Sequence, residues 1–327
     1  MTSITICLTT YNRLNLLRES VKSVLNQTFK DFHLVIANDY VEKEISMKNL
    51  NLSNDPRVKI INNKKNLGEI DNSNNILKSV STEWVCFLAD DDLIHPQFLE
   101  YLFSLANEYK NIIAIYPDFE IGKNVNKQFF KLYKNKRIHS KLSSNEFIKK
   151  YICGEIKFIG VYGLIKTNYL KKVGGLPILS KKQNIYSDTA LPVLLTQYGD
   201  IVWINQQLVF NRAHPLSRSM SDDFENLMEA QKNYLEITNS VLEEISISFK
   251  EMDLCRYNLF LQFAASQMFI LSKSKTNFIF SVIKFIGIQS KIFKYEISKK
   301  YRILFIFNMI LLLVKGSLRR IKLFLRI

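Results

Sequence analysis

The sequence has 327 residues, 47% of them apolar, which is enough to bury a sizeable core. The net charge of +15 is uneven, because residues 273–327 contain thirteen lysines or arginines and a single acid, Glu296. That segment alone carries +12, so the rest of the chain is close to neutral. The composition excludes a disordered chain and argues against a nucleic-acid-binding protein, in which basic residues would cover the folded domain.

The first third of the chain alternates apolar runs with helix-like stretches. The runs are ITICLTT, FHLVIAN, VKIINN and EWVCFLA, and apolar residues recur at helical spacing over residues 14–25 and 70–80. Strands that alternate with helices predict a doubly wound, mostly parallel sheet of the α/β class. Ligands of such sheets bind at the carboxyl ends of the strands.

Polar residues follow three of these runs. They are Thr9-Thr10-Tyr11-Asn12, Asn38-Asp39 and Asp90-Asp91-Asp92. The three carboxylates predict a site for a hard divalent cation, although an acidic loop that caps the next helix is the alternative. The chain has only ten glycines and neither GxGxxG nor GxxxxGK[ST], so a metal would have to neutralise any bound phosphate.

The rest of the chain divides in two. Residues 116–220 mix strand-like runs with turns, and from Asp222 onward the pattern is helical, with almost no glycine or proline until Gly287. We therefore expect a first, α/β domain over residues 1–220 and a helical region over 221–327. The four cysteines are far apart and form no CxxC pair, which is typical of reduced core thiols in a cytosolic protein.

The basic tail predicts attachment to an anionic membrane surface. Its longest apolar run, Ile303–Val314, is shorter than the roughly 20 residues that a spanning helix requires. Bulky aliphatic residues mixed with lysine and arginine suit an interfacial helix, which buries apolar side chains while its cations meet anionic headgroups. A helical subdomain packed on the first domain and a dimerisation bundle, which would make a homo-oligomer, are the alternatives.

Seven segments of the chain occur in the order and spacing of a known family. They are ICLTTYNR, VKSVLNQTFKDFHLVIANDY, NKKNLG, EWVCFLADDDLIHPQFLE, KVGGLP, SDTALPVLL and NRAHPLSRSMS. The chain from Ile4 to about Ser219 thereby resembles the inverting family 2 glycosyltransferases. The resemblance implies a GT-A fold, a Rossmann-like sheet flanked by helices, here with the basic helical region added at the C-terminal end.

The resemblance also implies roles for the polar residues at the strand ends. Thr9 and Tyr11 would line the nucleoside pocket, and Asp39 would accept a hydrogen bond from the base. Asp90 and Asp91 would hold the ribose and the metal, with Asp91 the direct ligand. Asp92 would assist at the metal or cap the helix begun near Pro96.

Two further residues match family positions. Asp188 corresponds to the catalytic base, which deprotonates the acceptor hydroxyl; an N-cap role on its helix is compatible with this. His214 corresponds to the histidine that approaches the metal or the diphosphate, although a lone histidine is as often structural. The chain departs from the family pattern at Ala89 and Ser187, where acids are common.

The implied activity is transfer of a sugar, with inversion, from a nucleotide sugar to a hydroxyl group. We expect a UDP-sugar donor, Mn²⁺ or Mg²⁺ as cofactor, and a polyprenyl-diphosphate-linked or glycan acceptor in surface-polysaccharide synthesis. The protein would be cytoplasmic and peripheral on the inner face of the cell membrane, and it would not bind nucleic acid. The alternative is a non-catalytic GT-A-like protein that binds a membrane or a partner through the tail.

Overall fold

The structure, a computed structural model, describes residues 3–133, 138–181, 185–213, 224–245, 247–273 and 298–306, with 308 and 310. The chain divides into two compact units. The first contains residues 1–147, 156–178 and 187–215, and the second contains 148–155, 179–186 and 216–327. The second unit thus includes two earlier segments of the chain as well as the region after residue 215.

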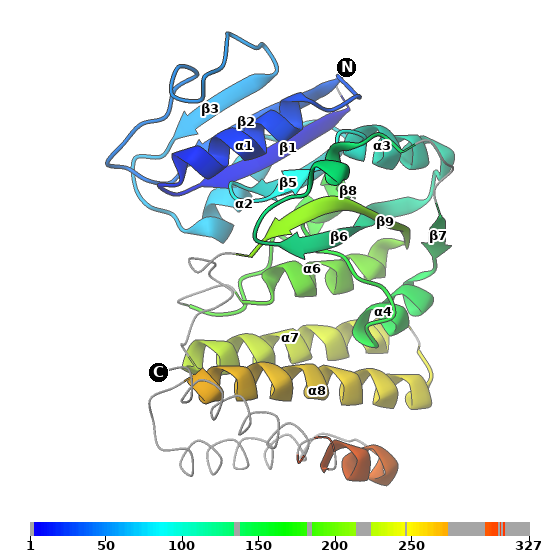
Figure 1. Cartoon of the computed structure of the whole chain (residues 1–327). Coiled ribbons are helices and arrows are strands. Elements are labelled where there is room, and N and C mark those ends of the chain that lie inside the picture. Colours follow the sequence, from blue (N-terminus) through cyan, green and yellow to red (C-terminus); the bar gives the residue numbers. More distant parts are fainter. Residues whose placement is uncertain are drawn as a thin grey trace. The chain divides into compact units, whose positions relative to one another are not determined.

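The first unit is built on one mixed sheet, whose N-terminal half is parallel. Neighbouring strands run in the order β3-β2-β1-β4, and every pair in this half is parallel. Apolar side chains fill both faces of these strands, as expected for a parallel sheet covered by helices. Figure 1 shows these elements in blue and cyan: β1 Ile4–Thr10, α1 Leu14–Leu25, β2 Phe32–Asn38, β3 Val58–Asn62, α2 Glu69–Ser79 and β4 Trp84–Ala89.

The other half of the sheet mixes directions. Strand β8 pairs antiparallel with β4 and β6, while β6 pairs parallel with β9, and β9 also receives β5 and β7 antiparallel. The strands of this half are β5 Leu93–Ile94, β6 Ile112–Gly122, β7 His139–Leu142, β8 Leu164–Lys166 and β9 Asp200–Arg212. The helices beside them are α3 Phe98–Glu108, η1 Lys127–Phe130, α4 Ser144–Ile152, α5 Thr167–Lys172, α6 Ser187–Leu195 and η2 Thr196–Tyr198.

The sequence prediction of a mostly parallel α/β fold is confirmed. Helix α1 has the predicted bounds, and α2 begins one residue before its predicted start. The main core of the unit packs buried side chains of β1, β2 and β4 against α1 and α3. Among these is Trp84, the largest buried side chain, which begins β4 and is 2% exposed.

The second unit is helical in its described part. Two long helices, α7 Phe224–Glu244 and α8 Phe249–Lys273, bury Tyr234, Leu242 and Phe260 among their apolar side chains. Lys149 forms an ion pair of 2.6 Å with Glu251 at the start of α8. No helix in the described ranges is both long enough and apolar enough to cross a membrane.

Candidate active site

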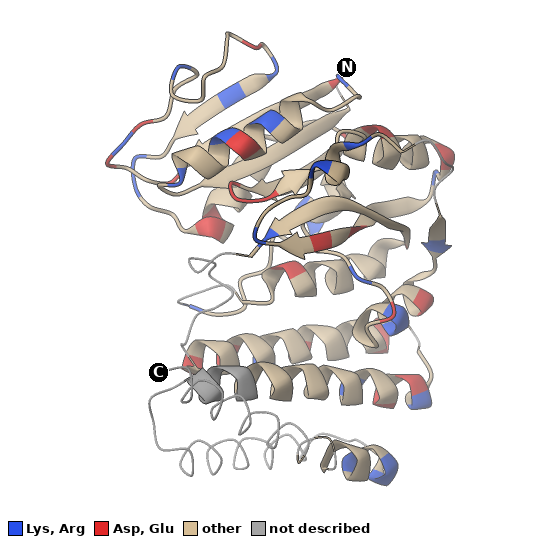
Figure 2. Cartoon of the chain, viewed as in Figure 1, with Lys and Arg blue, Asp and Glu red and all other residues tan. Residues whose placement is uncertain are grey.

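Strands β1, β2 and β4 end together at one edge of the sheet. In the parallel registers, Thr10 lies opposite Asn38 of β2, and Thr9 lies opposite Ala89 of β4. The structure therefore brings together the three polar segments that the sequence singles out. The loop from β4 to β5 stands out as acidic at this edge, because it is formed by Asp90, Asp91 and Asp92 (Figure 2).

Asp90 is fully buried and hydrogen-bonded to the end of β1. Its Oδ2 accepts a bond of 2.5 Å from the Thr10 hydroxyl and one of 3.3 Å from the Tyr11 backbone N–H. Burial raises the pKa of Asp90 to about 6, although Arg13 and the Thr10 hydroxyl act in the opposite direction. Asp90 is thus held in one orientation by β1.

Arg13 connects the first two aspartates. Its Nη2 lies 2.7 Å from Asp90 Oδ1 and its Nη1 lies 2.6 Å from Asp91 Oδ2. The contact with Asp90 Oδ1 is an ion pair. Burial disfavours the charged guanidinium, but the two carboxylates outweigh it and raise the pKa of Arg13. One guanidinium therefore balances two neighbouring like charges.

Asp92 is held by residues far away in the sequence. The Tyr162 hydroxyl and the Asn211 side-chain amide both donate to Asp92 Oδ2, the latter at 3.1 Å. The backbone N–H of Arg212 donates to Asp92 Oδ1 at 2.7 Å. Burial and the nearby Asp91 charge raise the pKa of Asp92 to about 7, while these three hydrogen bonds lower it.

These contacts bear on the alternative role of Asp92. Helix α3 has Gln97 as its N-cap residue, and the Gln27 side chain accepts the Leu99 N–H in its first turn at 2.9 Å, so Asp92 is not its cap. Instead, Asp92 ties the acidic loop to the end of β9. Arg212 strengthens this link, because its Nε donates to the Asp91 backbone carbonyl at 3.0 Å and its Nη2 pairs with Glu19 at 2.6 Å. A metal-ligand role for Asp92 stays a prediction.

Asp39 lies at the end of β2 and is 5% exposed. Its Oδ1 accepts bonds from the Asn63 side chain at 2.9 Å and the Leu67 N–H at 2.8 Å, and its Oδ2 accepts the Gly68 N–H at 2.7 Å. The carboxylate thus fixes the loop that leads into α2. A carboxylate has about four acceptor positions, so three internal bonds leave room for one more donor.

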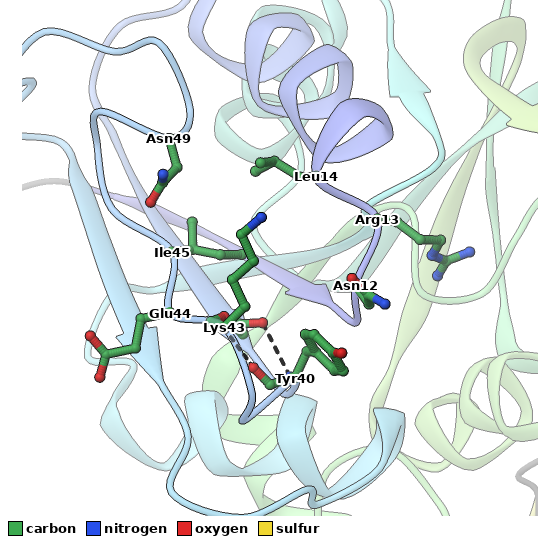
Figure 3. A pocket seen from close by; sticks show the side chains of 9 residues that line it. Asn12, Arg13, Leu14, Tyr40, Lys43, Glu44, Ile45 and Asn49 are labelled. Carbon is green, nitrogen blue, oxygen red and sulfur yellow. Dashed lines mark hydrogen bonds between the residues drawn. The ribbon is translucent and has the colours of Figure 1, made fainter.

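Tyr40 lines a small hollow at this edge, and Tyr11 packs against Tyr40. Tyr11 is 39% exposed and meets the ring of Tyr40 edge to face at 5.3 Å. Figure 3 shows the side chains around the hollow, with Lys43 near its centre and the guanidinium of Arg13 turned away from Lys43. Asn12, between Tyr11 and Arg13, has a left-handed backbone with φ of 53°, which turns the chain sharply from β1 into α1.

Asp188 lies in the first turn of α6, inside the helix, so it is not the N-cap residue. It is partly buried, and the Thr189 hydroxyl donates to its Oδ1 at 3.3 Å. Burial raises the pKa of Asp188, while hydrogen bonds from its own turn lower it. A carboxylate with a raised pKa in a locally bonded setting is suited to accept a proton.

A glycine sets the position of this turn. A Cβ on Gly160 would lie 1.9 Å from the Asp188 carbonyl oxygen and 2.5 Å from Cγ of Pro192. Pro192 has no N–H to bond that carbonyl, which is four residues earlier in α6. The loop at Gly160 therefore packs directly against the backbone of Asp188.

Two observations bear on the predicted metal ligands. His214 lies outside the described residues. Within the described ranges, no group of three or more histidine, cysteine, aspartate or glutamate residues could hold a metal ion. A cation at Asp91 would therefore need other ligands, and Mg²⁺-type sites commonly combine one or two carboxylates with substrate phosphates.

The sequence analysis missed three side chains of this edge, Arg13, Tyr162 and Asn211, and named Thr10 in a polar segment without giving it a role. Arg13 directly follows that segment, and a basic residue one position after a polar strand end was the available signal for it. Tyr162 and Asn211 gave no signal of their own, because their partner Asp92 is 70 and 119 positions away.

A mostly parallel sheet with carboxylates at its carboxyl edge is the plan of the GT-A fold. TarS 1-349 of Staphylococcus aureus, solved with UDP-GlcNAc, superposes with a TM-score of 0.52 at 15% identity, over 83% of this chain and 84% of that one. The mannosyltransferase PcManGT of Pyrobaculum calidifontis, solved with GDP-Man and Mn²⁺, gives 0.52 at 11% identity, over 97% and 86%. At these identities the similarity establishes the fold.

The family follows from the sequence match. The model of Glycosyl transferase family 2 matches residues 5–162, which include β1 to β6 and the acidic loop. Residues 5–162 therefore match a family 2 glycosyltransferase domain, and the resemblance seen in the sequence motifs is confirmed over that range.

Characterised relatives support the same assignment. The chain is 31% identical over 159 residues to the GalNAc(5)-diNAcBac-PP-undecaprenol beta-1,3-glucosyltransferase of Campylobacter jejuni, covering 47% of this chain and 50% of that protein. It is 30% identical over 121 residues to the UDP-Glc:alpha-D-GlcNAc-diphosphoundecaprenol beta-1,3-glucosyltransferase WfgD of Escherichia coli, covering 37% and 47%. The aligned parts thus span about half the length of these relatives.

Proposed function

We propose that this protein is a metal-dependent, inverting glycosyltransferase that transfers a sugar from a UDP-sugar to a hydroxyl group of a surface-glycan precursor. The observation that carries the proposal is the acidic loop after β4, where Asp90 and Asp91 lie side by side against β1 within the family 2 domain. The UDP-GlcNAc bound by TarS, which shares the fold, supports a uridine donor.

On the donor side, the edge of the sheet offers distinct partners for each part of a nucleotide. The exposed ring of Tyr11, together with Thr9, would pack against the nucleoside. Asp39 would accept one hydrogen bond from the base, since three internal bonds leave one acceptor position. Asp90 would accept a hydrogen bond from a ribose hydroxyl.

Asp91 is the residue that we propose as the metal ligand. Its carboxylate is a hard ligand of the type that Mn²⁺ and Mg²⁺ prefer. It already binds one positively charged group, the Arg13 guanidinium. When bound, the metal ion would neutralise the diphosphate leaving group. Asp92 would act chiefly by fixing the loop, because its two oxygens accept three protein hydrogen bonds; His214 remains a proposed further ligand.

Asp188 is the proposed catalytic base. Its carboxylate would take the proton from the acceptor hydroxyl while that oxygen attacks the anomeric carbon from the face opposite the diphosphate. A single displacement of this kind inverts the configuration. The raised pKa of Asp188 brings its proton affinity closer to neutral pH, which favours this role.

The acceptor that we propose is a polyprenyl-diphosphate-linked glycan. Both relatives from Campylobacter jejuni and Escherichia coli are named for undecaprenol-diphosphate substrates. A lipid-linked acceptor also gives a use to the basic tail, which would keep the enzyme peripheral on the inner face of the cell membrane. Most of that tail, including 274–297 and 311–327, lies outside the described residues.

The described part of the tail packs Phe305 against Phe260 of α8 and leaves basic and apolar side chains exposed beside it. Helical residues 299–306 combine three cations, at Lys299, Lys300 and Arg302 (blue in Figure 2), with the exposed side chains of Ile303 and Ile306, which are 60% and 47% exposed. Cations beside apolar side chains suit the surface of an anionic bilayer. Deleting residues 273–327 should abolish co-sedimentation with anionic vesicles, and equal sedimentation of both proteins would contradict this role.

The function is tested with a panel of nucleotide sugars. We expect one UDP-sugar to raise the melting temperature and to be hydrolysed slowly, both only when Mn²⁺ or Mg²⁺ is present. Asp91→Asn should remove both effects, because it removes one charge and one hard ligand. Metal-dependent binding without hydrolysis or transfer, with every acceptor tried, would support the non-catalytic alternative instead.

A further inference from the structure

The Arg13 guanidinium supplies positive charge at Asp90 and Asp91, where the proposed metal ion would also supply it. Its guanidinium touches one oxygen of Asp90 and one of Asp91, at 2.7 and 2.6 Å. These are the two carboxylates that the proposed function gives to the ribose and the metal. Two adjacent carboxylates repel each other, and a cation between them offsets that repulsion.

A second arginine, Arg212 of β9, also contacts the acidic loop, but its guanidinium does so through the loop's backbone. Arg212 bonds the Asp91 backbone carbonyl through Nε and pairs with Glu19 through Nη2. Its contacts hold the backbone of the acidic loop, whereas Arg13 contacts the carboxylates themselves. Of these two arginines, Arg13 is therefore the one whose contacts a metal ion at Asp91 would disturb.

The Arg13 side chain can move while its backbone stays in place. The Arg13 carbonyl accepts the Leu17 N–H at 2.9 Å, which anchors the residue at the start of α1. The side chain is 28% exposed, so the guanidinium borders solvent on one side. A change of rotamer would therefore release Asp91 without unfolding the turn.

We propose that Arg13 is an exchangeable counter-cation of the metal site. In the ligand-free protein it holds Asp91 in place and competes with free metal ions for Asp91 Oδ2. When metal and nucleotide enter together, the cation takes over Asp91, and the diphosphate offers the displaced guanidinium new acceptor oxygens with the bidentate geometry that arginine favours. Arg13 thereby makes metal binding depend on the nucleotide. This inference rests on the proposed function.

The test uses the full chain with Arg13→Gln and measures two affinities. Binding of Mn²⁺ alone, followed through the electron spin resonance of free Mn²⁺, should become roughly fivefold tighter, because a competing ion pair of this exposure is lost. Binding of UDP at saturating Mn²⁺, followed by calorimetry, should become about tenfold weaker, because a charged phosphate contact is lost. Opposite changes in one variant are the signature of exchange.

Arg57→Gln is the matched control. Arg57 pairs with Asp55 at 2.7 Å, the same kind of contact, in the loop before β3 and away from the carboxyl edge. Neither affinity should change in that variant. Arg13→Lys, which keeps the charge but loses the fork of two donors, should fall between wild type and Arg13→Gln for both affinities, and it replaces Arg13→Gln if thermal melting shows that variant to be unfolded.

Several outcomes would overturn the inference. If both affinities weaken in Arg13→Gln, Arg13 merely supports the site, and if neither moves, Arg13 takes no part in it. A failure of the proposed function is distinct, because wild-type protein would then show no metal-dependent binding of UDP at all. The titration with Mn²⁺ alone would still report whether Arg13 competes for Asp91.

Discussion

The acidic loop after β4 and the first turn of α6 hold their carboxylates in opposite ways. In the loop, donors from β1, from β9 and from Tyr162 meet Asp90 and Asp92. In α6, Asp188 accepts bonds from its own turn, among them that of the Thr189 hydroxyl. Burial raises the pKa of a carboxyl in both regions, yet among the described residues only the loop surrounds its charges with long-range partners.

This difference in hydrogen-bond partners suits two different chemical roles. Carboxylates that bind a metal and a ribose need fixed positions, and a network of donors from several strands provides them. A carboxylate that takes up a proton needs a raised pKa and fewer competing donors, because each donor favours the charged form. The predictions that follow change one region at a time, beginning with the largest expected effect.

The largest effect should come from Asp188→Asn. Asparagine keeps the size and polarity of the side chain but cannot accept the proton, so turnover should fall by about 10²-fold or more, the usual contribution of a general base. Initial rates with the correct UDP-sugar and acceptor measure this. Normal turnover in the variant would move the base to another residue.

A tenfold effect is expected from Gly160→Ala. The new Cβ would lie 1.9 Å from the Asp188 carbonyl oxygen, so α6 or the facing loop has to shift and misplace the base. Turnover should fall by about tenfold while UDP binding changes little. Gly122→Ala is the control, because its Cβ would meet the Phe210 ring at 3.2 Å and no backbone atom closer than 3.6 Å.

Tyr162→Phe weakens the support of the acidic loop and leaves all three aspartates in place. It removes the hydroxyl that donates to the buried Asp92, which should lower the free energy of unfolding by about 1–3 kcal/mol and weaken metal-dependent UDP binding several-fold. Tyr116→Phe is the matched control, since the Tyr116 hydroxyl is buried without a partner in the described structure. Chemical denaturation should show the control to be as stable as wild type.

The smallest effect concerns pH. A base works only when unprotonated, and burial raises the pKa of Asp188, so the acid limb of the turnover profile should lie at higher pH than an ordinary aspartate would give. Turnover should fall as pH decreases through that raised pKa. The residual turnover of Asp188→Asn should lack this limb, and a profile identical to wild type would assign the limb to another group.

Local sequence patterns were sufficient to predict the parallel half of the fold. The apolar runs of β1, β2 and β4 and the helical spacing of α1 each lie within a dozen residues, and the strand ends then place Asp39 and Asp90 at one edge. The mixed half was less predictable. FIGVYGLI resembles a strand, but only its last two residues belong to β8, which begins at Leu164.

The support around the acidic residues could not be predicted in the same way. The clamp on Asp92 comes from residues 70 to 120 positions later, and a single sequence carries no periodicity at such separations. The helix-cap alternative for Asp92 failed because α3 begins only at Phe98, after a short strand and a turn have intervened. Arg13 could have been predicted, because it directly follows Asn12, the last residue of a predicted polar segment.

The central claim is that Asp91 binds the metal and its nucleotide while Asp188 acts only in the chemical step. Calorimetric titration of UDP in the presence of Mn²⁺ into wild type, Asp91→Asn and Asp188→Asn tests this in one experiment. The account predicts that Asp91→Asn loses metal-dependent binding and that Asp188→Asn binds within a few-fold of wild type. Unchanged affinity in Asp91→Asn, or an equal loss in both variants, would contradict this division of roles.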